Sequence, residues 1–279
     1  MTNENTITYI SFGAGVQSTT LLLMSTLGIY DCPRADVAIF ADTQTEGPWT
    51  LKHIEKVRKL TDIPIKICTA GDLGHETIHG KAGLNKLGKP YKKFVSLPVY
   101  GLDPNDHRKT AMMARQCTFK FKIEPCEKAV REFLGYKPRQ RMKHKVQCLI
   151  GISLDEAQRM KPSRTRWVTN AWPLVEARIH REKCKLILKE HGWPVPFKSS
   201  CWHCPFHSND YWLWLQKEWP ETWMEAVAFD KAIRNLSLLG EKAPIYLHST
   251  CQPLDEVDFS EGGQLRFQFM NECEGFCGV

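Results

Sequence analysis

Apolar strand-like runs alternate with helix-like segments near the start of the chain, and this alternation constrains the fold more than any other feature. Residues 7–12, 35–41 and 65–68 have the composition of buried strands. Helix-like segments lie between them at 19–27, which is followed by a glycine, and at 48–60, which begins with a proline. Strands that alternate with helices form parallel sheets with right-handed crossovers. The sequence therefore predicts an α/β fold in which a parallel sheet is flanked by helices.

The later part of the chain adds further elements to this pattern. Another buried strand is expected at 146–152, and helices are expected at 124–134, 178–191 and 220–236. Residues 69–110 are rich in Gly, Lys, Pro and Asp, and they are predicted to form an irregular substrate loop or lid.

Two regions are expected from this order of elements. The first is an α/β nucleotide-binding domain over residues 1–160, which includes a basic substrate loop at 69–145. The second is a helical C-terminal region over residues 161–279, a Cys-rich extension packed on the first domain.

Polar and glycine residues follow three of the predicted strands. The loop Gly13–Ser18 follows the first strand, Asp42 ends the second, and Ser153–Glu156 follow the strand at 146–152. Ligands of parallel α/β sheets bind beyond the carboxyl ends of the strands. A glycine-rich turn before a helix lets backbone N–H groups converge on a phosphate, although these residues alone fit an ordinary tight turn equally well. The loop matches neither the G-x-x-x-x-G-K-[ST] nor the G-x-G-x-x-G pattern.

Eleven cysteines in a chain without a recognisable secretion signal favour metal binding or thiol chemistry over a disulfide framework. Cys201 and Cys204 form a C-x-x-C pair, and Cys117 lies far upstream in a basic segment. Spacing alone leaves an iron–sulfur cluster and a zinc site open, because His203 or His207 could complete four zinc ligands. A further set of cysteines lies in or beside apolar runs and is expected to be inert: Cys32, Cys68 and Cys148.

Charge is unevenly distributed along the chain, whose formal net charge is +7. Residues 81–145 carry 17 Lys and Arg against 5 Asp and Glu, and the densest part is 137–145. Such a zone indicates an anionic partner such as nucleic acid, or a solvated lysine-rich surface. No apolar run approaches the length of about 20 residues that spans a bilayer, so the expectation is a cytoplasmic protein without a membrane partner.

The segment Ser11–Thr19 resembles the PP-loop of the ATP pyrophosphatases, in particular the branch that contains the sulfonucleotide (PAPS) reductases. The usual form of this loop is S-G-G-x-D-S, and here Gly13 replaces its first Ser and Gln17 replaces its Asp. Other similar segments follow in the family's order: Phe40–Glu46, Cys117 with Lys122–Pro125, and Gly151–Arg159. The resemblance implies an adenine-nucleotide α-hydrolase-like fold.

The resemblance also implies which residues bind and react. ATP, with Mg²⁺ if the altered loop still holds it, would contact Ser11, Gly13, Ala14, Gly15, Gln17, Ser18 and Asp42. Lys122, Asp155 and Arg159 would face the substrate as catalytic residues, or would belong to a salt-linked surface.

Related adenylyl-sulfate reductases hold a [4Fe–4S] cluster with a C-C pair and a later C-x-x-C. Thr118 replaces the second cysteine of the pair, which leaves Cys117, Cys201 and Cys204 as metal ligands. This set resembles the three-cysteine cluster of tRNA-thiolating PP-loop enzymes, in which the open iron is thought to bind the transferred sulfur.

Two more cysteines, Cys273 and Cys277, lie at the end of the sequence. This segment is loosely similar to the terminal E-C-G of the sulfonucleotide reductases, whose cysteine attacks sulfur. The pair could serve as catalytic thiols, relay a persulfide, supply a fourth cluster ligand or simply be exposed.

Taken together, the resemblance implies an iron–sulfur ATP pyrophosphatase that adenylylates a nucleic acid for sulfur insertion. It is closest in kind to the ATP-pyrophosphatase component of DNA phosphorothioation systems, with DNA favoured over tRNA and a cysteine desulfurase as sulfur donor. Assembly into an oligomer is compatible with the sequence. The alternatives are a sulfonucleotide reductase that uses Cys273 or Cys277, and a zinc-stabilised, non-catalytic nucleic-acid-binding module.

Overall fold

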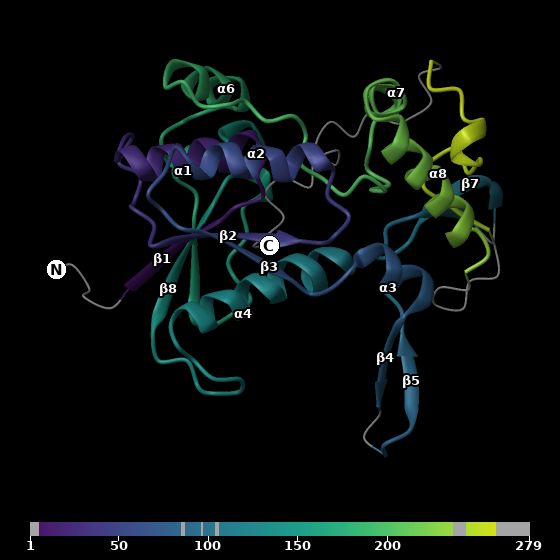
Figure 1. Cartoon of the computed structure of the whole chain (residues 1–279), viewed down its shortest axis with the longest axis horizontal. Coiled ribbons are helices and arrows are strands. Elements are labelled where there is room, and N and C mark those ends of the chain that lie inside the picture. The colour runs from purple at the N-terminus through teal and green to yellow at the C-terminus, as the bar shows by residue number, and fades with distance from the viewer. Residues whose placement is uncertain (1–5, 85–86, 96, 104–105, 237–243, 261–279) are drawn as a thin grey trace.

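The computed structural model describes residues 6–84, 87–95, 97–103, 106–236 and 244–260 (Figure 1). Its centre is a five-stranded sheet in the order β3-β2-β1-β8-β9, and every neighbouring pair is parallel. The strands are β1 (Thr6–Ser11), β2 (Val37–Asp42), β3 (Ile65–Thr69), β8 (Lys145–Ile150) and β9 (Val168–Ala171). The α/β class predicted from the sequence is confirmed, and four of these strands lie where the apolar runs place them.

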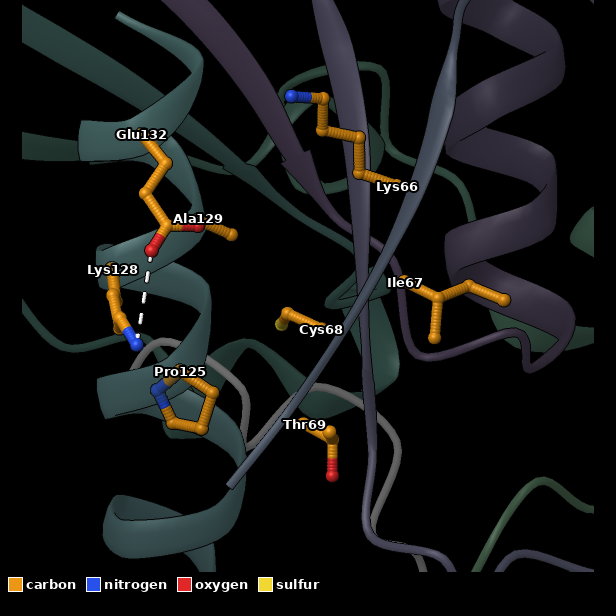
Figure 2. A pocket seen from close by; sticks show the side chains of 8 residues that line it. All are labelled: Lys66, Ile67, Cys68, Thr69, Pro125, Lys128, Ala129 and Glu132. Atoms are coloured by element: carbon orange, nitrogen blue, oxygen red, sulfur yellow. Dashed lines mark ion pairs between the residues drawn. The ribbon is translucent and has the colours of Figure 1, made fainter. Parts of the chain in front are cut away.

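Helices cover both faces of this sheet. One face carries α1 (Val16–Leu27), α2 (Pro48–Arg58), α5 (Pro173–Glu176) and α6 (Arg181–Glu190), whose apolar side chains share one buried cluster. The other face carries α4 (Glu124–Phe133), which leaves a groove along the edge strand β3 (Figure 2). The molecule therefore has a helix–sheet–helix arrangement around the parallel strands (Figure 1).

Local sequence signals explain where the first helices begin and end. Gly28 follows α1 with a left-handed φ of 65°, and its N–H donates to the Met24 carbonyl, so the helix stops there. Pro48 occupies the first turn of α2, where its missing N–H costs nothing. The predicted helix limits at 27 and 48 are both confirmed.

Residues 69–112 differ from the irregular loop that the sequence predicts. They contain α3 (Leu73–His79), the hairpin of β4 (Lys81–Leu84) and β5 (Pro90–Lys93), and the antiparallel pair of β6 (Tyr100–Asp103) and β7 (Asp106–Met112). Asp72 caps α3 by accepting the His75 N–H at 2.9 Å. Leu73, Val95, Leu97 and Val99 are buried, although the Gly, Lys, Pro and Asp content of the segment predicts an irregular loop.

The remaining elements pack beside the carboxyl edge of the sheet around a second apolar cluster (Figure 1). They are η1 (Phe119–Ile123), α7 (Asn209–Glu218), α8 (Pro220–Ile233), β10 (Ile245–Tyr246) and η4 (Leu254–Glu256), whereas η2 (Leu154–Arg159) follows β8 and contacts α5. Trp212 of α7 is fully buried in this cluster, and Trp49, Trp214, Trp219 and Trp223 pack against it. The tryptophans thus fill the core here rather than present open stacking surfaces. Within the described ranges, no helix has both the length and the apolar character needed to cross a bilayer.

Burial of His53 on α2 predicts a dependence of stability on pH. Burial, followed by the charge of Lys56, lowers the pKa of His53 from 6.5 to about 4, and its ring lies 3.0 Å from the Thr19 hydroxyl. The unfolded chain therefore takes up this proton first, so stability is lost as the pH falls from about 6.5 to about 4. We expect His53→Gln to flatten this part of the unfolding free-energy profile, measured by urea denaturation. Parallel profiles for both proteins would contradict the assignment.

Candidate nucleotide and cysteine site

The carboxyl ends of β1, β2 and β8 lie at one edge of the sheet, and the loop that follows β1 is sharply bent. The Phe12 N–H continues the ladder to the Ile39 carbonyl at 2.9 Å, and Ala14 then adopts a left-handed φ of 57°. A non-glycine residue in this conformation costs free energy, so the surrounding packing must hold it. The Gly15 N–H donates to the Ser18 hydroxyl at 3.1 Å. The loop thus places the start of α1 directly after β1, at the carboxyl edge of the sheet, where a helix N-terminus can attract a phosphate.

Gly151 allows the end of β8 to approach this loop closely. A Cβ atom at this position would lie 2.8 Å from the Ser18 nitrogen and 2.9 Å from the Ser18 Cα. Both contacts are to backbone, which cannot rotate away. Close packing against the loop thus explains why position 151 is a glycine.

Gly151→Ala is expected to lower the free energy of unfolding by about 1–3 kcal/mol, because the added methyl group must displace the first turn of α1. Denaturant unfolding measures this change. Gly101→Ala is the matched control, because the nearest atom to its Cβ is the Pro244 carbonyl oxygen at 3.6 Å. Equal losses in the two variants would contradict the close approach.

Gln17 of this loop points into the protein and is fully buried. Its Nε2 donates to the Ser153 hydroxyl at 3.1 Å and to the Glu156 carboxylate at 2.8 Å, and its Oε1 accepts from Arg181 at 2.7 Å. These contacts tie the loop to η2 and α6. The structure thus gives Gln17 a scaffolding role, with its amide already engaged by protein groups.

The predicted substrate-facing residues of η2 are also held by the protein. Arg159 is buried, and its Nη1 lies 2.7 Å from the Glu156 carboxylate. Asp155 accepts the Arg181 N–H at 3.0 Å. Burial raises the pKa of Asp155, but hydrogen bonds from Ser153 and the Arg181 N–H outweigh it and leave the pKa below its usual value. Partners of Gln17 thus hold both side chains beside the loop, Glu156 holding Arg159 and Arg181 holding Asp155.

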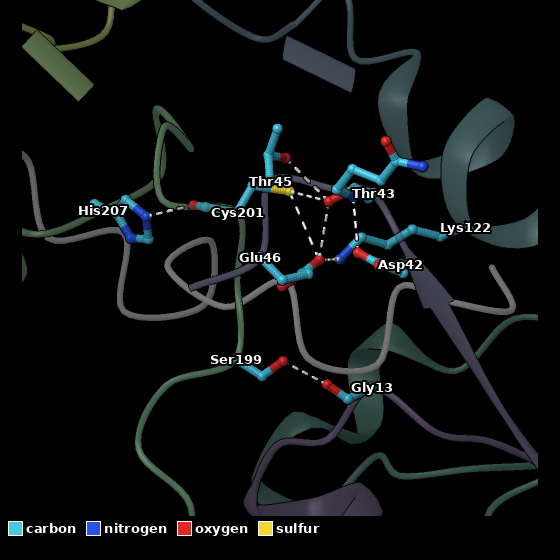
Figure 3. Close-up of polar contacts among 10 residues, drawn as sticks. Gly13, Asp42, Thr43, Thr45, Glu46, Lys122, Ser199, Cys201 and His207 are labelled. Carbon is cyan, nitrogen blue, oxygen red and sulfur yellow. Dashed lines mark hydrogen bonds and ion pairs between the residues drawn. The ribbon is translucent and has the colours of Figure 1, made fainter. Parts of the chain in front are cut away.

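The C-x-x-C segment runs directly beside the loop Gly13–Ser18 (Figure 3). The Ser199 hydroxyl donates to the Gly13 carbonyl at 2.6 Å. Two residues later Cys201 forms an antiparallel bridge with Glu46, and the Trp202 N–H donates to the Thr45 carbonyl at 2.9 Å. One short strand-like stretch therefore connects the loop after β1, the loop after β2 and the cysteines.

A buried polar cluster lies where these segments meet (Figure 3). The Glu46 Oε1 atom accepts from Lys122 Nζ at 3.2 Å, from the Thr43 hydroxyl at 3.2 Å and from the Cys201 thiol at 3.7 Å. The side chains of Glu46 and Lys122 are only 1% and 11% exposed. Lys122, predicted to face the substrate, is thus found in a buried ion pair. Asp42 lies beside this cluster and accepts the Gln44 N–H at 2.7 Å.

Cys201 and Cys204 lie on one tight turn, in which the Cys204 N–H donates to the Cys201 carbonyl at 3.1 Å. His207 follows, and its Nε2 donates to the same carbonyl at 2.8 Å. Cys117 and Cys204 pack partly buried against the apolar cluster that contains Cys201. Burial raises the pKa of Tyr211 well above its usual value, and the nearby Cys204 and Cys201 add to this shift.

The surroundings of the three thiols suit a soft metal centre in composition. Thiolates select iron–sulfur clusters or zinc, and apolar walls limit access by water. Within the described part of the chain, no three His, Cys, Asp or Glu side chains are arranged together as metal ligands. Among the described residues, several nearby polar atoms are buried without a hydrogen-bond partner: both ring nitrogens of His203, Ser200 Oγ and Thr118 Oγ1. The chemistry of the donors fits such a centre, and ligation would have to draw Cys117 onto the turn.

Two features singled out from the sequence are not among the described residues that form this site. Cys273 and Cys277 lie outside the described residues. The densest basic stretch, 137–145, connects α4 to the amino end of β8, at the edge of the sheet opposite the loop Gly13–Ser18. The charge near the site instead comes from buried Lys122 and Arg159 and from Arg181.

Three residues of this cluster were not singled out from the sequence. Glu46 and Thr43 belong to the segment after β2, where the motif drew attention only to Asp42. Ser199 precedes the C-x-x-C, and its contact with Gly13 joins residues 186 positions apart. No local pattern in the sequence indicates such a long-range contact.

Comparison with known proteins gives a distant structural likeness. No protein-family model matches the chain, and no curated protein matches it. Among solved structures, the chain is similar to the phosphoadenylyl-sulfate (PAPS) reductase from Candida auris in its phosphate complex, with a TM-score of 0.43 and 18% identity. The match covers 72% of this chain and 83% of that one. The α/β class assigned above rests on this chain's own sheet topology.

Proposed function

We propose that this chain is a PP-loop enzyme that binds ATP beyond the carboxyl ends of β1 and β2 and adenylylates an oxygen of a nucleic acid for sulfur insertion. The single observation that supports it best is the Ser199–Gly13 hydrogen bond of 2.6 Å. It holds the C-x-x-C turn against the loop that would bind the phosphates. Activation by nucleotide and delivery of sulfur could therefore occur at one place.

The loop residues would perform the nucleotide step. The start of α1 and the amides of Gly13 and Ala14 would bind the departing phosphates, since a helix N-terminus attracts anions. Attack of the acceptor oxygen on the α-phosphorus would release pyrophosphate and leave an adenylylated acceptor. Sulfur would then displace AMP, a far better leaving group than the original oxygen.

Cys117, Cys201 and Cys204 would hold an iron–sulfur cluster in this proposal, and a cluster with one open iron would supply a binding point for sulfur. The Glu46–Lys122 pair would position Cys201, through the contact of 3.7 Å between the thiol and the carboxylate. Buried apolar side chains around the cysteines would exclude water from a reactive sulfur species.

DNA is the proposed acceptor, with a cysteine desulfurase as the donor of sulfur. The proposal for DNA rests on the basic zone at 81–145, where 17 basic residues outnumber 5 acidic ones. Its densest part lies at the far edge of the sheet, so a duplex held there would have to extend around the molecule to reach the loop.

Ser18→Ala tests the nucleotide loop. The Ser18 hydroxyl accepts the Gly15 N–H and holds the turn, so its loss is expected to weaken ATP binding about tenfold. Calorimetric titration of ATP measures this, and Ser25→Ala on the same helix is the control. Ser25 is fully buried and bonds the Pro33 carbonyl, away from the loop. Equal ATP affinity in wild type and Ser18→Ala would contradict the loop assignment.

Metal analysis of anaerobically purified protein separates the proposal from its alternatives. Brown protein with about four irons and matching sulfide supports the cluster. Brown protein that leaves ATP intact but reduces a sulfonucleotide would favour the reductase. Colourless protein that holds zinc after anaerobic handling would favour the non-catalytic nucleic-acid-binding module.

A further inference from the structure

A second thiol site lies away from the nucleotide loop, between the edge strand β3 and α4. Cys68 on β3 lines a groove of about 330 Å³ that opens to solvent (Figure 2). Pro125, Lys128 and Ala129 of α4 form the opposite wall. Cys68 is partly exposed there, which differs from the inert apolar role that its strand context predicts.

Cys126, also on α4, lies behind this groove. It is 4% exposed and belongs to the apolar cluster under α4, against which Cys68 packs. The two thiols come from elements 58 residues apart, so only packing of α4 on the sheet edge brings them together. One of them faces solvent and the other does not.

Some groups around Cys68 lower its pKa, and others raise it. The hydrogen bond with Cys126 lowers the pKa of Cys68, and burial with the carboxylates of Glu132 and Asp42 opposes this shift, but the pKa remains below its usual value. Lys66 and Lys128 also line the groove. A thiol with a lowered pKa and access to solvent is the kind that reacts with oxidants.

We propose that Cys68 and Cys126 form a redox-active pair, in which Cys68 reacts with a hydroperoxide that enters the groove and Cys126 then closes a disulfide between β3 and α4. This pair is independent of the proposed function, since neither cysteine belongs to the C-x-x-C site.

The chemistry balances with the peroxide as the only oxidant. The Cys68 thiolate attacks one peroxide oxygen, the O–O bond breaks, and Cys68 becomes a sulfenic acid while hydroxide leaves. The Cys126 thiol then attacks the Cys68 sulfur, the S–O bond breaks, and water leaves with the thiol proton. Two electrons pass from the thiol pair to the peroxide, which is reduced to water.

The cross-link would lie next to the nucleotide edge of the sheet. Cys68 pairs in register with Ala41 on β2, and Thr69 pairs with Asp42. The disulfide would therefore fix α4 to the strand beside Asp42.

Peptide mapping after peroxide treatment tests the pair in the full chain. Reduced protein is treated with hydrogen peroxide, alkylated, digested and analysed by mass spectrometry. We expect a Cys68–Cys126 disulfide that forms at least about tenfold faster than oxidation of Cys251. Cys251 is the matched control, because it is also partly exposed while burial raises its pKa to about 11.

Two variants isolate the order of events. Cys126→Ser should leave a Cys68 sulfenic acid that dimedone captures, and Cys68→Ser should leave Cys126 as a free thiol. Cys126→Ala serves in place of Cys126→Ser if the serine disturbs the core. Oxidation of Cys68 no faster than that of Cys251, or oxidised Cys68 with Cys126 still free in the wild type, would overturn the proposal.

Discussion

Lys122→Met is expected to lower the free energy of unfolding by about 3–5 kcal/mol, because it leaves the buried Glu46 carboxylate without its cation. Lys122 Nζ lies 3.2 Å from that carboxylate, whose side chain is only 1% exposed. The second carboxylate oxygen, Oε2, already lacks a hydrogen-bond partner among the described residues. Methionine matches the length of the lysine chain and keeps its apolar contacts. The loss of unfolding free energy therefore measures the effect of removing the charge.

Denaturant unfolding of matched variants separates this effect from a general effect of lysine replacement. Lys120 pairs with Glu124 at 3.0 Å, but these side chains are 38% and 55% exposed, so Lys120→Met should change stability by less than about 1 kcal/mol. Adding Glu46→Gln to Lys122→Met should recover part of the loss, because the uncompensated charge is then removed. A loss for Lys122→Met no larger than that for Lys120→Met would rule out a buried ion pair.

Cys201→Ala should reduce bound iron from about four atoms per chain to nearly none, and Cys117→Ala and Cys204→Ala should do the same. Each change removes one of three thiolates, and a [4Fe–4S] cluster held by two cysteines is not retained through purification. Iron and sulfide content, together with the visible spectrum of anaerobically prepared protein, measure the loss.

The control for these variants is a cysteine outside the proposed ligand set. Cys273→Ala should leave the absorption spectrum intact. Cys148→Ala controls for loss of a buried thiol in the sheet, because Cys148 is fully buried on β8. Iron retained after Cys117→Ala would contradict the three-ligand assignment.

The sheet could be predicted because its signals are local. The strand at 7–12, the glycine after residue 27 and Pro48 each mark an element by their own residue types, and the structure confirms them. Strand β9 could not be predicted in the same way. It has only four residues, and its place at the sheet edge depends on pairing with β8 rather than on its own composition.

Part of the candidate site could be predicted from the sequence in the same way, and part could not. The loop Gly13–Ser18 and Asp42 could be placed at the carboxyl edge, because strand order in a parallel sheet brings those ends together. The partner of Lys122 could not be predicted, because Glu46 lies 76 residues away and nothing in either segment specifies the other. Gln17 shows the same limit, since its role is set by Ser153, Glu156 and Arg181.

Pyrophosphate release from ATP is the measurement that tests the proposed function most directly. Protein purified without oxygen is mixed with ATP and magnesium, with and without duplex DNA, and pyrophosphate and AMP are quantified. The proposal predicts pyrophosphate release that DNA stimulates and that Ser18→Ala reduces. ATP left intact under both conditions, in protein that carries its full iron content, would contradict an adenylylating enzyme.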